Sequence, residues 1–315
     1  MIVLITGSSG FIGFHLSNFF LKKGYKVLGL DNHNNYYSKK IKNKRLLFLK
    51  KKRKFSYFNV DLTNFKHLEN IFLKNLPDIV FHLAGQPGVL YSFKNPKSYK
   101  LNNVVATKNI CKLSLKYKVK KFFFASSSSV YGDQKKFPIK ETYITRPKNP
   151  YAISKLESEK IVKKTFNKSK TNYLIFRFFS VYGPLGRPDM FIHKFLNYVK
   201  LNKTIKLFNN GLNYRDFTFI DDVIGTLYTA LRKKIKKQTI NICRSKPIQT
   251  IDIVRILKKT LNKKKIKINN TKFVKGEMLK THGCNKKMRK ISNFKFTNLE
   301  IGLKKTVKMY KKYKF

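Results

Sequence analysis

Two residues at helical spacing, Tyr151 and Lys155, could act together as an acid–base pair. Side chains four residues apart lie on one face of a helix. A phenol titrates near pKa ~10, which is too high for a base at neutral pH, but a nearby ammonium group favours the phenolate. At about 4 Å and an effective dielectric constant of about 20, that charge contributes roughly 4 kcal/mol before desolvation and screening. This is enough to lower the pKa by about two or three units, so the pair predicts a general base.

A cluster of four serines, Ser126–Ser129, precedes this pair and leads into Val130-Tyr131-Gly132. The cluster follows the run Lys120–Ala125, which we expect to be a strand. Open α/β sheets bind their ligands at the carboxyl ends of strands. A serine cluster is most often only a turn, and a Tyr-x-x-x-Lys spacing is common by chance. Whether either pattern indicates a functional site therefore depends on the strands and helices around it.

The amino-terminal stretch IVLITGSSGFIG, residues Ile2 to Gly13, predicts the element that gives the pair its context. A short apolar run with β-branched residues is typical of a buried strand, and a helical pattern begins where the glycines end. Glycines allow a tight turn, close approach to a pyrophosphate, and close packing of helix on strand. The amides at the helix start then face the phosphates. We therefore expect a dinucleotide to be bound by Gly7, Gly10, Phe11, Ile12 and Gly13.

A carboxylate follows each of the next two expected strands. Asp31 closes the strand Tyr25–Leu30, where an acid would hold the ribose hydroxyls of NAD and repel the extra phosphate of NADP. Asp61 follows the strand Phe55–Val60, where it could bond the adenine amino group or simply help to cap a helix. We expect NAD as the cofactor, and its positive nicotinamide ring would further favour the Tyr151 phenolate.

Strands and helices alternate along the first half of the chain. Asp78–Leu83 is an apolar strand that ends in Ala84-Gly85, and Pro96–Tyr117 is expected to be one long helix. This alternation predicts an α/β fold, with a Rossmann-type doubly wound parallel sheet. Between the second and third strands, a basic stretch that ends at Lys54 is expected to be an exposed helical insertion.

We expect two structural units. Residues 1–180 would form the NAD-binding Rossmann domain. Residues 181–315 would be mostly a smaller substrate lobe, with about 215–243 returning to the first domain. In that lobe we expect a loop and helix over Arg187–Lys200 and a strand over Lys206–Phe208.

The net charge of +55 is the unusual feature of the composition. Basic patches bind nucleic acid or anionic membrane surfaces, but only ten of the 70 basic residues are arginine and the lysines are spread along the chain. Compositional drift is the simpler explanation, so we expect no nucleic acid partner. No apolar run is long enough to span a bilayer. The first strand begins at Ile2, and the three cysteines lack metal-ligand spacing. We therefore expect a cytoplasmic protein with no metal.

Several stretches together carry a resemblance to a known family. They are Leu30-Asp31-Asn32 with Tyr36-Tyr37, Ala84-Gly85-Gln86 with Gly88-Val89, Ala125 to Gly132, Arg177 to Pro184, Gly186 to Met190, and Arg215 to Asp222. The chain resembles the extended short-chain dehydrogenases/reductases, in their NAD-dependent nucleotide-sugar epimerase/dehydratase group. Within that group it is most similar to UDP-glucuronate 4-epimerases. The resemblance runs from Met1 to about Asp222.

The resemblance implies a mechanism and a set of site residues. Tyr151 would remove the proton of the sugar C4 hydroxyl, Ser127 would bond the same oxygen, and Lys155 would hold the nicotinamide ribose and lower the tyrosine pKa. NAD would take the C4 hydride, return it to the other face of the sugar, and stay bound. Besides the residues already named, the implied cofactor contacts are Asn32, Leu62, Leu83, Ala84, Gly85, Asn103 and Phe178.

The resemblance also implies residues that bind a UDP-sugar. Arg215 would grip the diphosphate, although a surface ion pair with Asp216 is the alternative. Ser128, Ser129 and Ser180 would bind a sugar carboxylate, with Arg187 as a further candidate. The acids that related dehydratases and decarboxylases carry in the serine cluster are absent, which disfavours both of those reactions.

The chain departs from the family pattern at several positions. Leu90 stands where these epimerases usually have Arg, Ser180 replaces a Thr, and Gly283-Cys284 replaces an Ala-Asp, whereas Gly276-Glu277 resembles a family Gly-Asp. Leu90 leaves open a neutral substrate such as UDP-glucose, UDP-galactose or UDP-xylose. A non-catalytic NAD-binding or nucleic-acid-binding protein is the third hypothesis. The family also implies a homodimer, formed through helices near 96–117 and 151–167.

Overall fold

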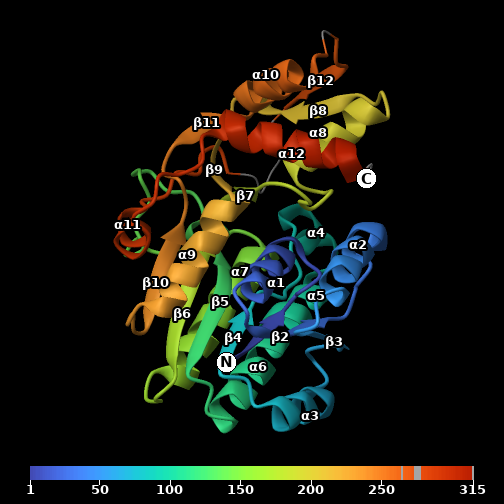
Figure 1. Ribbon diagram of the computed structural model, residues 1–315. Helices are drawn as coiled ribbons and strands as arrows, with labels where there is room; N and C mark the ends of the chain where they lie inside the picture. Colours follow the sequence, from blue (N-terminus) through green and yellow to red (C-terminus); the bar gives the residue numbers. More distant parts are fainter. Residues whose placement is uncertain (264, 273–277, 314–315) are drawn as a thin grey trace.

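The computed structural model describes residues 1–263, 265–272 and 278–313, and its centre is a parallel sheet of seven strands (Figure 1). Their order is β10-β6-β5-β4-β1-β2-β3. The strands are β1 (Ile2–Thr6), β2 (Lys26–Asp31), β3 (Phe55–Asn59), β4 (Ile79–His82), β5 (Lys121–Ser127), β6 (Asn172–Phe178) and β10 (Gln238–Ile242). Every neighbouring pair in this sheet is parallel. The order reverses between β1 and β4, and open α/β sheets bind ligands at such a switch point.

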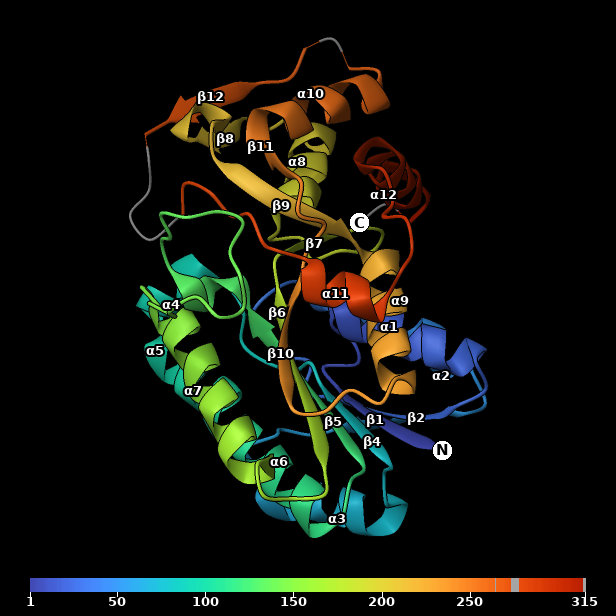
Figure 2. The ribbon, with the colours of Figure 1, turned by 90° about the vertical axis from the view of Figure 1, so that its left-hand side faces the viewer.

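Helices cover both faces of this sheet (Figure 2). One face carries α3 (Phe65–Asn75), α6 (Ala106–Lys116) and α7 (Pro150–Phe166), and the other carries α1 (Phe11–Lys22), α2 (Lys39–Lys50), α9 (Ile220–Arg232) and α11 (Lys286–Ile291). Because both faces are covered, the central strands are largely apolar: Val80 and Phe81, neighbours on β4, are both fully buried. The predicted α/β fold with a doubly wound parallel sheet is confirmed.

A smaller lobe lies beyond the carboxyl ends of the strands (Figure 1). It contains a three-stranded sheet of β7 (Ser180–Tyr182), β9 (Tyr214–Phe219) and β11 (Pro247–Gln249), and a pair of β8 (Ile205–Phe208) with β12 (Ile268–Thr271). Its helices are α8 (Phe191–Lys200), α10 (Thr250–Leu261) and α12 (Leu299–Tyr313). Strand β10 belongs to the main sheet, whereas β9 pairs with the smaller one. The predicted division near residue 180 stays a prediction, because strand pairing does not delimit independently folding units.

The helix expected over Pro96–Tyr117 is not uniform. It consists of α5 (Pro96–Tyr99), a π-helical segment (Lys100–Val105) and α6. Within the π segment, the Asn103 carbonyl accepts hydrogen bonds from the hydroxyls of Thr107 (2.5 Å) and Ser158 (3.1 Å). Hydroxyls that bond to a helix carbonyl compete with the regular backbone ladder, and π segments often accompany functional sites.

Helix α2 differs from the exposed insertion expected from the sequence. The Ser38 side chain caps it by accepting from the Lys40 amide. Its basic residues do not all face water, because Lys42 is 4% exposed and Arg45 is 1% exposed. The side chain of Arg45 is among the largest that are fully buried in the described residues.

Membrane-spanning helices, metal-binding clusters and disulfides are all absent from the described residues. None of their helices is both long enough and apolar enough to cross a lipid bilayer. No group of three or more His, Cys, Asp or Glu side chains among them is placed to hold a metal ion. All three cysteines are buried and carry free thiols.

Candidate active site

A cavity of about 1180 Å³ lies between the main sheet and the smaller lobe. Most of the predicted cofactor residues line it: Gly7, Gly10, Phe11, Ile12, Gly13, Asp31, Asn32, Leu62, Leu83, Ala84, Gly85, Tyr151, Lys155 and Phe178. The predicted substrate residues line it as well: Ser127, Ser128, Ser129, Ser180, Arg187 and Arg215. Residues from both parts of the chain therefore share one cavity.

The glycine turn between β1 and α1 is packed too closely for side chains. Gly7 has a φ of +69°, and a Cβ there would lie 2.9 Å from the backbone nitrogen of Ala84. A Cβ on Gly13 would lie 2.1 Å from the Gly7 carbonyl oxygen. The first-turn amides of a helix have no intrahelical partner, and those of α1 belong to Phe11, Ile12 and Gly13, which line the cavity. This cradle fits the pyrophosphate of a dinucleotide.

Asp31 ends β2 beside this turn. Its Oδ2 accepts a hydrogen bond from the Ser9 amide (3.1 Å) and its Oδ1 accepts one from the His33 amide (2.9 Å). These bonds fix the carboxylate against the glycine turn, at the edge of the cavity. An acid fixed there is suited to the ribose hydroxyls of NAD and unsuited to an added phosphate.

Two of the predicted cofactor residues do not line this cavity. Asp61 lies in a smaller neighbouring pocket, and its carboxylate accepts from the Thr63 amide (2.8 Å) and hydroxyl (2.7 Å). The cap of α3 is Asn64, so Asp61 is not the capping residue. Asn103 is buried behind the cavity wall, where its side chain accepts from the Gln86 amide (2.7 Å) and donates to the Ser154 hydroxyl (2.8 Å).

Tyr151 and Lys155 lie on α7 as their spacing predicts. Asn149 caps the helix by accepting from the Ala152 amide (2.9 Å), which places Tyr151 in the first turn. The Lys155 ammonium donates to the Ala125 carbonyl at the end of β5 (2.9 Å). A Cβ on Gly85 would lie 3.0 Å from that ammonium and 2.8 Å from the Asn103 side-chain oxygen, so both side chains pack closely against this glycine. The contacts of this pair therefore join α7 to the ends of β4 and β5.

The electrostatics of this pair differ from the sequence-based prediction. Burial raises the pKa of Tyr151, and the Ser127 hydroxyl and the Arg187 charge oppose this to a smaller extent. Burial lowers the pKa of Lys155 to about 8, against the opposing effect of the Glu159 carboxylate. The direction for Tyr151 is opposite to the one expected from the lysine alone. A phenolate at neutral pH therefore needs further positive charge in the cavity.

The serine cluster forms a turn at the end of β5. Ser127 ends the strand and Ser128 begins a 3₁₀ turn that ends at Tyr131. The Ser127 hydroxyl donates to the Ser129 hydroxyl (3.1 Å) and accepts from the Ser129 amide (3.2 Å). Ser180 begins β7, and its side chain belongs to the same cavity. These hydroxyls surround one region of the cavity and are suited to binding an oxygen-rich group.

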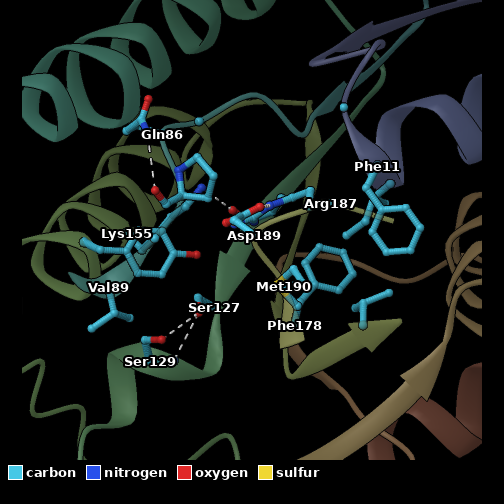
Figure 3. Close-up of a pocket in the computed structure, with 18 of the residues that line it drawn as sticks. Phe11, Gln86, Val89, Ser127, Ser129, Lys155, Phe178, Arg187, Asp189 and Met190 are labelled. Atoms are coloured by element: carbon cyan, nitrogen blue, oxygen red, sulfur yellow. Dashed lines mark hydrogen bonds and ion pairs between the residues drawn. The ribbon is translucent and has the colours of Figure 1, made fainter. Parts of the chain in front are cut away.

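An ion pair lies in the middle of the cavity (Figure 3). The Arg187 guanidinium donates to both carboxylate oxygens of Asp189, at 3.1 Å and 2.5 Å, and the Tyr36 hydroxyl donates to the same carboxylate (3.2 Å). Figure 3 shows the pair between Lys155 on one side and Phe11 on the other. This geometry is the fork that arginine offers to carboxylates and phosphates.

Two further predicted positions have clear placements. Arg215 donates to the Tyr214 carbonyl (3.0 Å) at the cavity wall, whereas the Asp216 carboxylate is buried and accepts from the Ser245 and Gly283 amides. The Asp216 carboxylate is therefore bonded in the interior, which does not fit the alternative, a surface ion pair between Arg215 and Asp216. Leu90, on the short helix α4 (Val89–Lys94), lines the cavity with 44% of its side chain exposed. Gly283-Cys284 belongs to the packing around Cys243 and Phe179, and Gly276-Glu277 lies outside the described residues.

Sequence reasoning missed several residues that the fold brings into the cavity, among them Asp189, Lys42 and Gln86. Asp189 and Gln86 lie inside stretches that carry the family resemblance. The sequence analysis identified these stretches but gave neither residue a role in the site. Lys42 stands in a basic run, where nothing distinguishes a buried lysine from its solvated neighbours. No local signal could have found it.

Comparison with known proteins adds to this geometry. A model of the NAD dependent epimerase/dehydratase family matches residues 3–243. The chain belongs to this family. The resemblance found in the sequence, and the NAD dependence that it implied, are thereby confirmed at the level of the family.

Members of the epimerase/dehydratase family resemble the chain over nearly its whole length. It is 37% identical to the UDP-glucuronate 4-epimerase of Thermodesulfobacterium geofontis, over 96% of this chain and 94% of that protein. The UDP-glucuronic acid 4-epimerase of Bacillus cereus, solved with UDP-glucuronic acid and NAD, has 31% identity and a TM-score of 0.93, over 99% and 100% of the two chains. The UDP-glucose 4-epimerase of Thermotoga maritima, solved with UDP-glucose, has 27% identity and a TM-score of 0.91, over 100% of both.

Proposed function

We propose that this protein converts UDP-glucuronate to UDP-galacturonate by NAD-dependent epimerisation at C4, through a transient 4-keto sugar. The observation that carries the proposal is the convergence of Tyr151, Lys155 and the serine cluster on one cavity with the Arg187 fork. The likeness to UDP-glucuronate 4-epimerases over nearly the whole chain supports it.

The chain's own residues divide the acid–base work. Tyr151 takes the proton of the C4 hydroxyl, and Ser127, whose hydroxyl affects the tyrosine pKa, orients the same oxygen. Lys155, fixed by the Ala125 carbonyl, holds a ribose hydroxyl and supplies positive charge. The glycine turn and Asp31 hold the NAD, which when bound accepts the C4 hydride and returns it to the other face of the sugar. The keto sugar has to turn over between these two transfers, in the part of the cavity that the NAD leaves unfilled.

The sugar carboxylate needs its own binding groups. A 4-keto uronate is a β-keto acid that readily loses carbon dioxide, so the site must hold the carboxylate where this loss is disfavoured. Ser128, Ser129 and Ser180 offer hydroxyls. Arg187, whose Nε and one terminal nitrogen bond to Asp189, offers positive charge and its other terminal nitrogen. We assign the diphosphate to Arg215, which lines the same cavity from β9.

A neutral UDP-sugar is the second candidate substrate. Leu90 places an apolar side chain on the cavity wall where related epimerases usually have a cation. The likeness to a UDP-glucose 4-epimerase is consistent with this alternative. The serines and Arg187 favour the uronate, because a hydrogen bond from a guanidinium N–H group is stronger to a carboxylate than to a hydroxyl.

The test is to incubate the purified protein with UDP-glucuronate, without added NAD, and to resolve the sugar products. We expect UDP-galacturonate from the native protein and none from Tyr151→Phe. We expect Arg187→Met to reduce kcat/KM for UDP-glucuronate by about 10- to 100-fold, because a charge-assisted hydrogen bond contributes roughly 1.5–3 kcal/mol. Turnover of UDP-glucose by the native protein, without turnover of UDP-glucuronate, would instead assign the neutral sugar and point to Leu90.

We also propose a homodimer in the cytoplasm. Three apolar side chains on or near α6 and α7 are exposed, namely Leu101 (41%), Leu115 (44%) and Ile153 (44%). A partner that packed on these helices would remove them from water. Size-exclusion chromatography with light scattering should give twice the chain mass of 37.1 kDa, and a single-chain mass would reject the dimer.

A further inference from the structure

Basic side chains lie within hydrogen-bond distance of four successive backbone carbonyls, in the loop of residues 183–190 that follows β7. His193 Nε2 lies 2.9 Å from the Gly183 oxygen, and His15 Nε2 lies 2.9 Å from the Pro184 oxygen. Arg45 donates to the next two, the oxygens of Leu185 and Gly186. His15 is on α1 and Arg45 is on α2. Side chains from two helices of the main domain therefore contact a loop that leads into the smaller lobe (Figure 1).

Arg45 makes the largest share of these contacts. Its Nε donates to the Leu185 oxygen (3.1 Å), one terminal nitrogen donates to the oxygens of Leu185 (2.5 Å) and Gly186 (3.0 Å), and the other donates to the Ser9 oxygen (3.0 Å) and the Tyr37 hydroxyl (3.1 Å). These five bonds use all five N–H groups of the guanidinium. Because a buried cation is costly unless its donors are satisfied, a side chain that is 1% exposed keeps this geometry only while all three segments stay in place.

The segments that Arg45 joins belong to two parts of the cavity, the part assigned to NAD and the part assigned to the sugar. Ser9 is in the glycine turn, and its amide donates to Asp31, the residue assigned to the ribose of NAD. Leu185 and Gly186 directly precede Arg187, the fork assigned to the sugar carboxylate. Leu185 has a φ of +53°, a left-handed conformation that is uncommon for a branched residue and needs support from its surroundings. The Arg45 side chain therefore bonds directly to both the glycine turn and the loop that carries Arg187.

We propose that Arg45 is a positioning residue that couples the binding of NAD to the binding of the UDP-sugar. The identity of the two ligands rests on the proposed function; the coupling rests on the contacts of Arg45. When the glycine turn closes on one ligand, the Ser9 carbonyl fixes the guanidinium, which in turn fixes the 183–190 loop in the conformation that the other ligand needs. Coupling of this kind is reciprocal, and typical coupling energies correspond to roughly 5- to 150-fold changes in affinity.

The test removes the retained nucleotide and then measures the dissociation constant of NAD by calorimetry, with and without saturating UDP-glucuronate, in a Tyr151→Phe background where no turnover occurs. The coupling ratio is the dissociation constant of NAD without UDP-glucuronate divided by the constant with it. We expect this ratio to be at least about five, and Arg45→Met to reduce it to about one. Arg45→Lys keeps the charge but has three N–H groups instead of five, so its ratio should fall between these values. Arg53→Met, at an exposed position just after the same helix, is the matched control and should keep the full ratio.

The ratio separates coupling from a purely structural role. A structural Arg45 would weaken both affinities, or lower the melting temperature, and leave the ratio unchanged in Arg45→Met. That result would overturn the proposal, as would a ratio of one in the parent protein. A full ratio in a protein that binds both ligands but forms no UDP-galacturonate in the native background would keep the coupling and reject the proposed reaction.

Discussion

At the scale of single residues, the acid–base pair is tuned by burial as much as by charge. Burial raises the pKa of the Tyr151 phenol and lowers the pKa of the Lys155 ammonium to about 8. Both shifts favour the neutral forms, which alone would leave no base at neutral pH. The ammonium is nevertheless charged over most of the range below pH 8. Lys155 and the positive charge of bound NAD must together stabilise the phenolate.

This leads to a prediction for Lys155→Met. Activity should rise with pH as Tyr151 loses its proton, and should stop rising near pH 8 as Lys155 loses its charge. Without the ammonium, the midpoint of the rising limb should move up by about two to three pH units, which corresponds to a roughly 100- to 1000-fold loss of kcat/KM at pH 7.

The measurement is the pH profile of kcat/KM with UDP-glucuronate. Lys160→Met removes an exposed lysine from the same helix and should leave the profile unchanged. A Lys155→Met profile with the native midpoint and only a lower plateau would show that the lysine positions the cofactor without tuning the tyrosine.

The sequence was enough to predict the residues whose chemistry shows in their type and spacing. Tyr151, Lys155 and the glycines lie where their patterns predict, because each pattern is set by the geometry of one helix or one turn. Asp189 and Arg45 were not predicted. Asp189 pairs with Arg187 only two positions away, but its contact with Tyr36 spans 153 positions. Arg45 bonds to the 183–190 loop, up to 141 positions away, and no local pattern contains such long-range contacts.

At the scale of elements, the turn between β1 and α1 sets the position of the cofactor. The helix packs so closely on the turn that a Cβ at Gly13 would lie 2.1 Å from the Gly7 oxygen, a backbone atom that cannot move independently. We expect Gly13→Ala to displace the turn and to abolish retention of NAD through purification, as measured by chromatography of the nucleotide released from denatured protein.

Gly225→Ala is the control for this prediction. Gly225 lies inside α9, and its added Cβ would meet only Phe294, at 3.6 Å. In a helix interior, alanine is more favourable than glycine by up to about 1 kcal/mol, so this variant should keep its NAD and melt at the native temperature or slightly above. Full NAD retention by Gly13→Ala would mean that the turn between β1 and α1 adapts to the added methyl group and does not set the position of the cofactor.

Strands and helices could be predicted from the sequence where one clear hydrophobic pattern sets their bounds. The prediction was less accurate where side-chain hydrogen bonds change the backbone conformation. The central strands agree with the prediction to within one or two residues, because continuous apolar runs between turns have few other solutions. The helix expected over 96–117 contains a π segment, within which hydroxyls from two helices bond to the Asn103 carbonyl and compete with the regular backbone ladder. That competition depends on α7, which follows much later in the chain.

At the scale of the whole molecule, the charge of +55 acts on stability. Like charges repel in the compact state more than in the unfolded chain, and salt screens them with a Debye length of about 10 Å at 0.1 M. The melting temperature should therefore rise as NaCl increases from about 10 to 300 mM, where the Debye length becomes shorter than typical spacings between surface charges.

Differential scanning fluorimetry across this salt series checks the prediction. The unlike-charge pairs at the surface, such as Lys148 with Asp133 and Arg255 with Asp252, weaken with salt but contribute little. A melting temperature that falls or stays flat with NaCl would mean that these pairs, or bound anions, already offset the repulsion at low salt.

The central claim is that a hydride leaves C4 of the sugar and returns to the same carbon inside a closed cavity. The most direct test uses UDP-glucuronate that carries deuterium at C4, converted in ordinary water without added NAD. We predict that the UDP-galacturonate formed keeps its deuterium at C4, because the hydride never exchanges with solvent. Loss of the label to water, in a product that is still UDP-galacturonate, would contradict the account, since the configuration would then change by proton exchange.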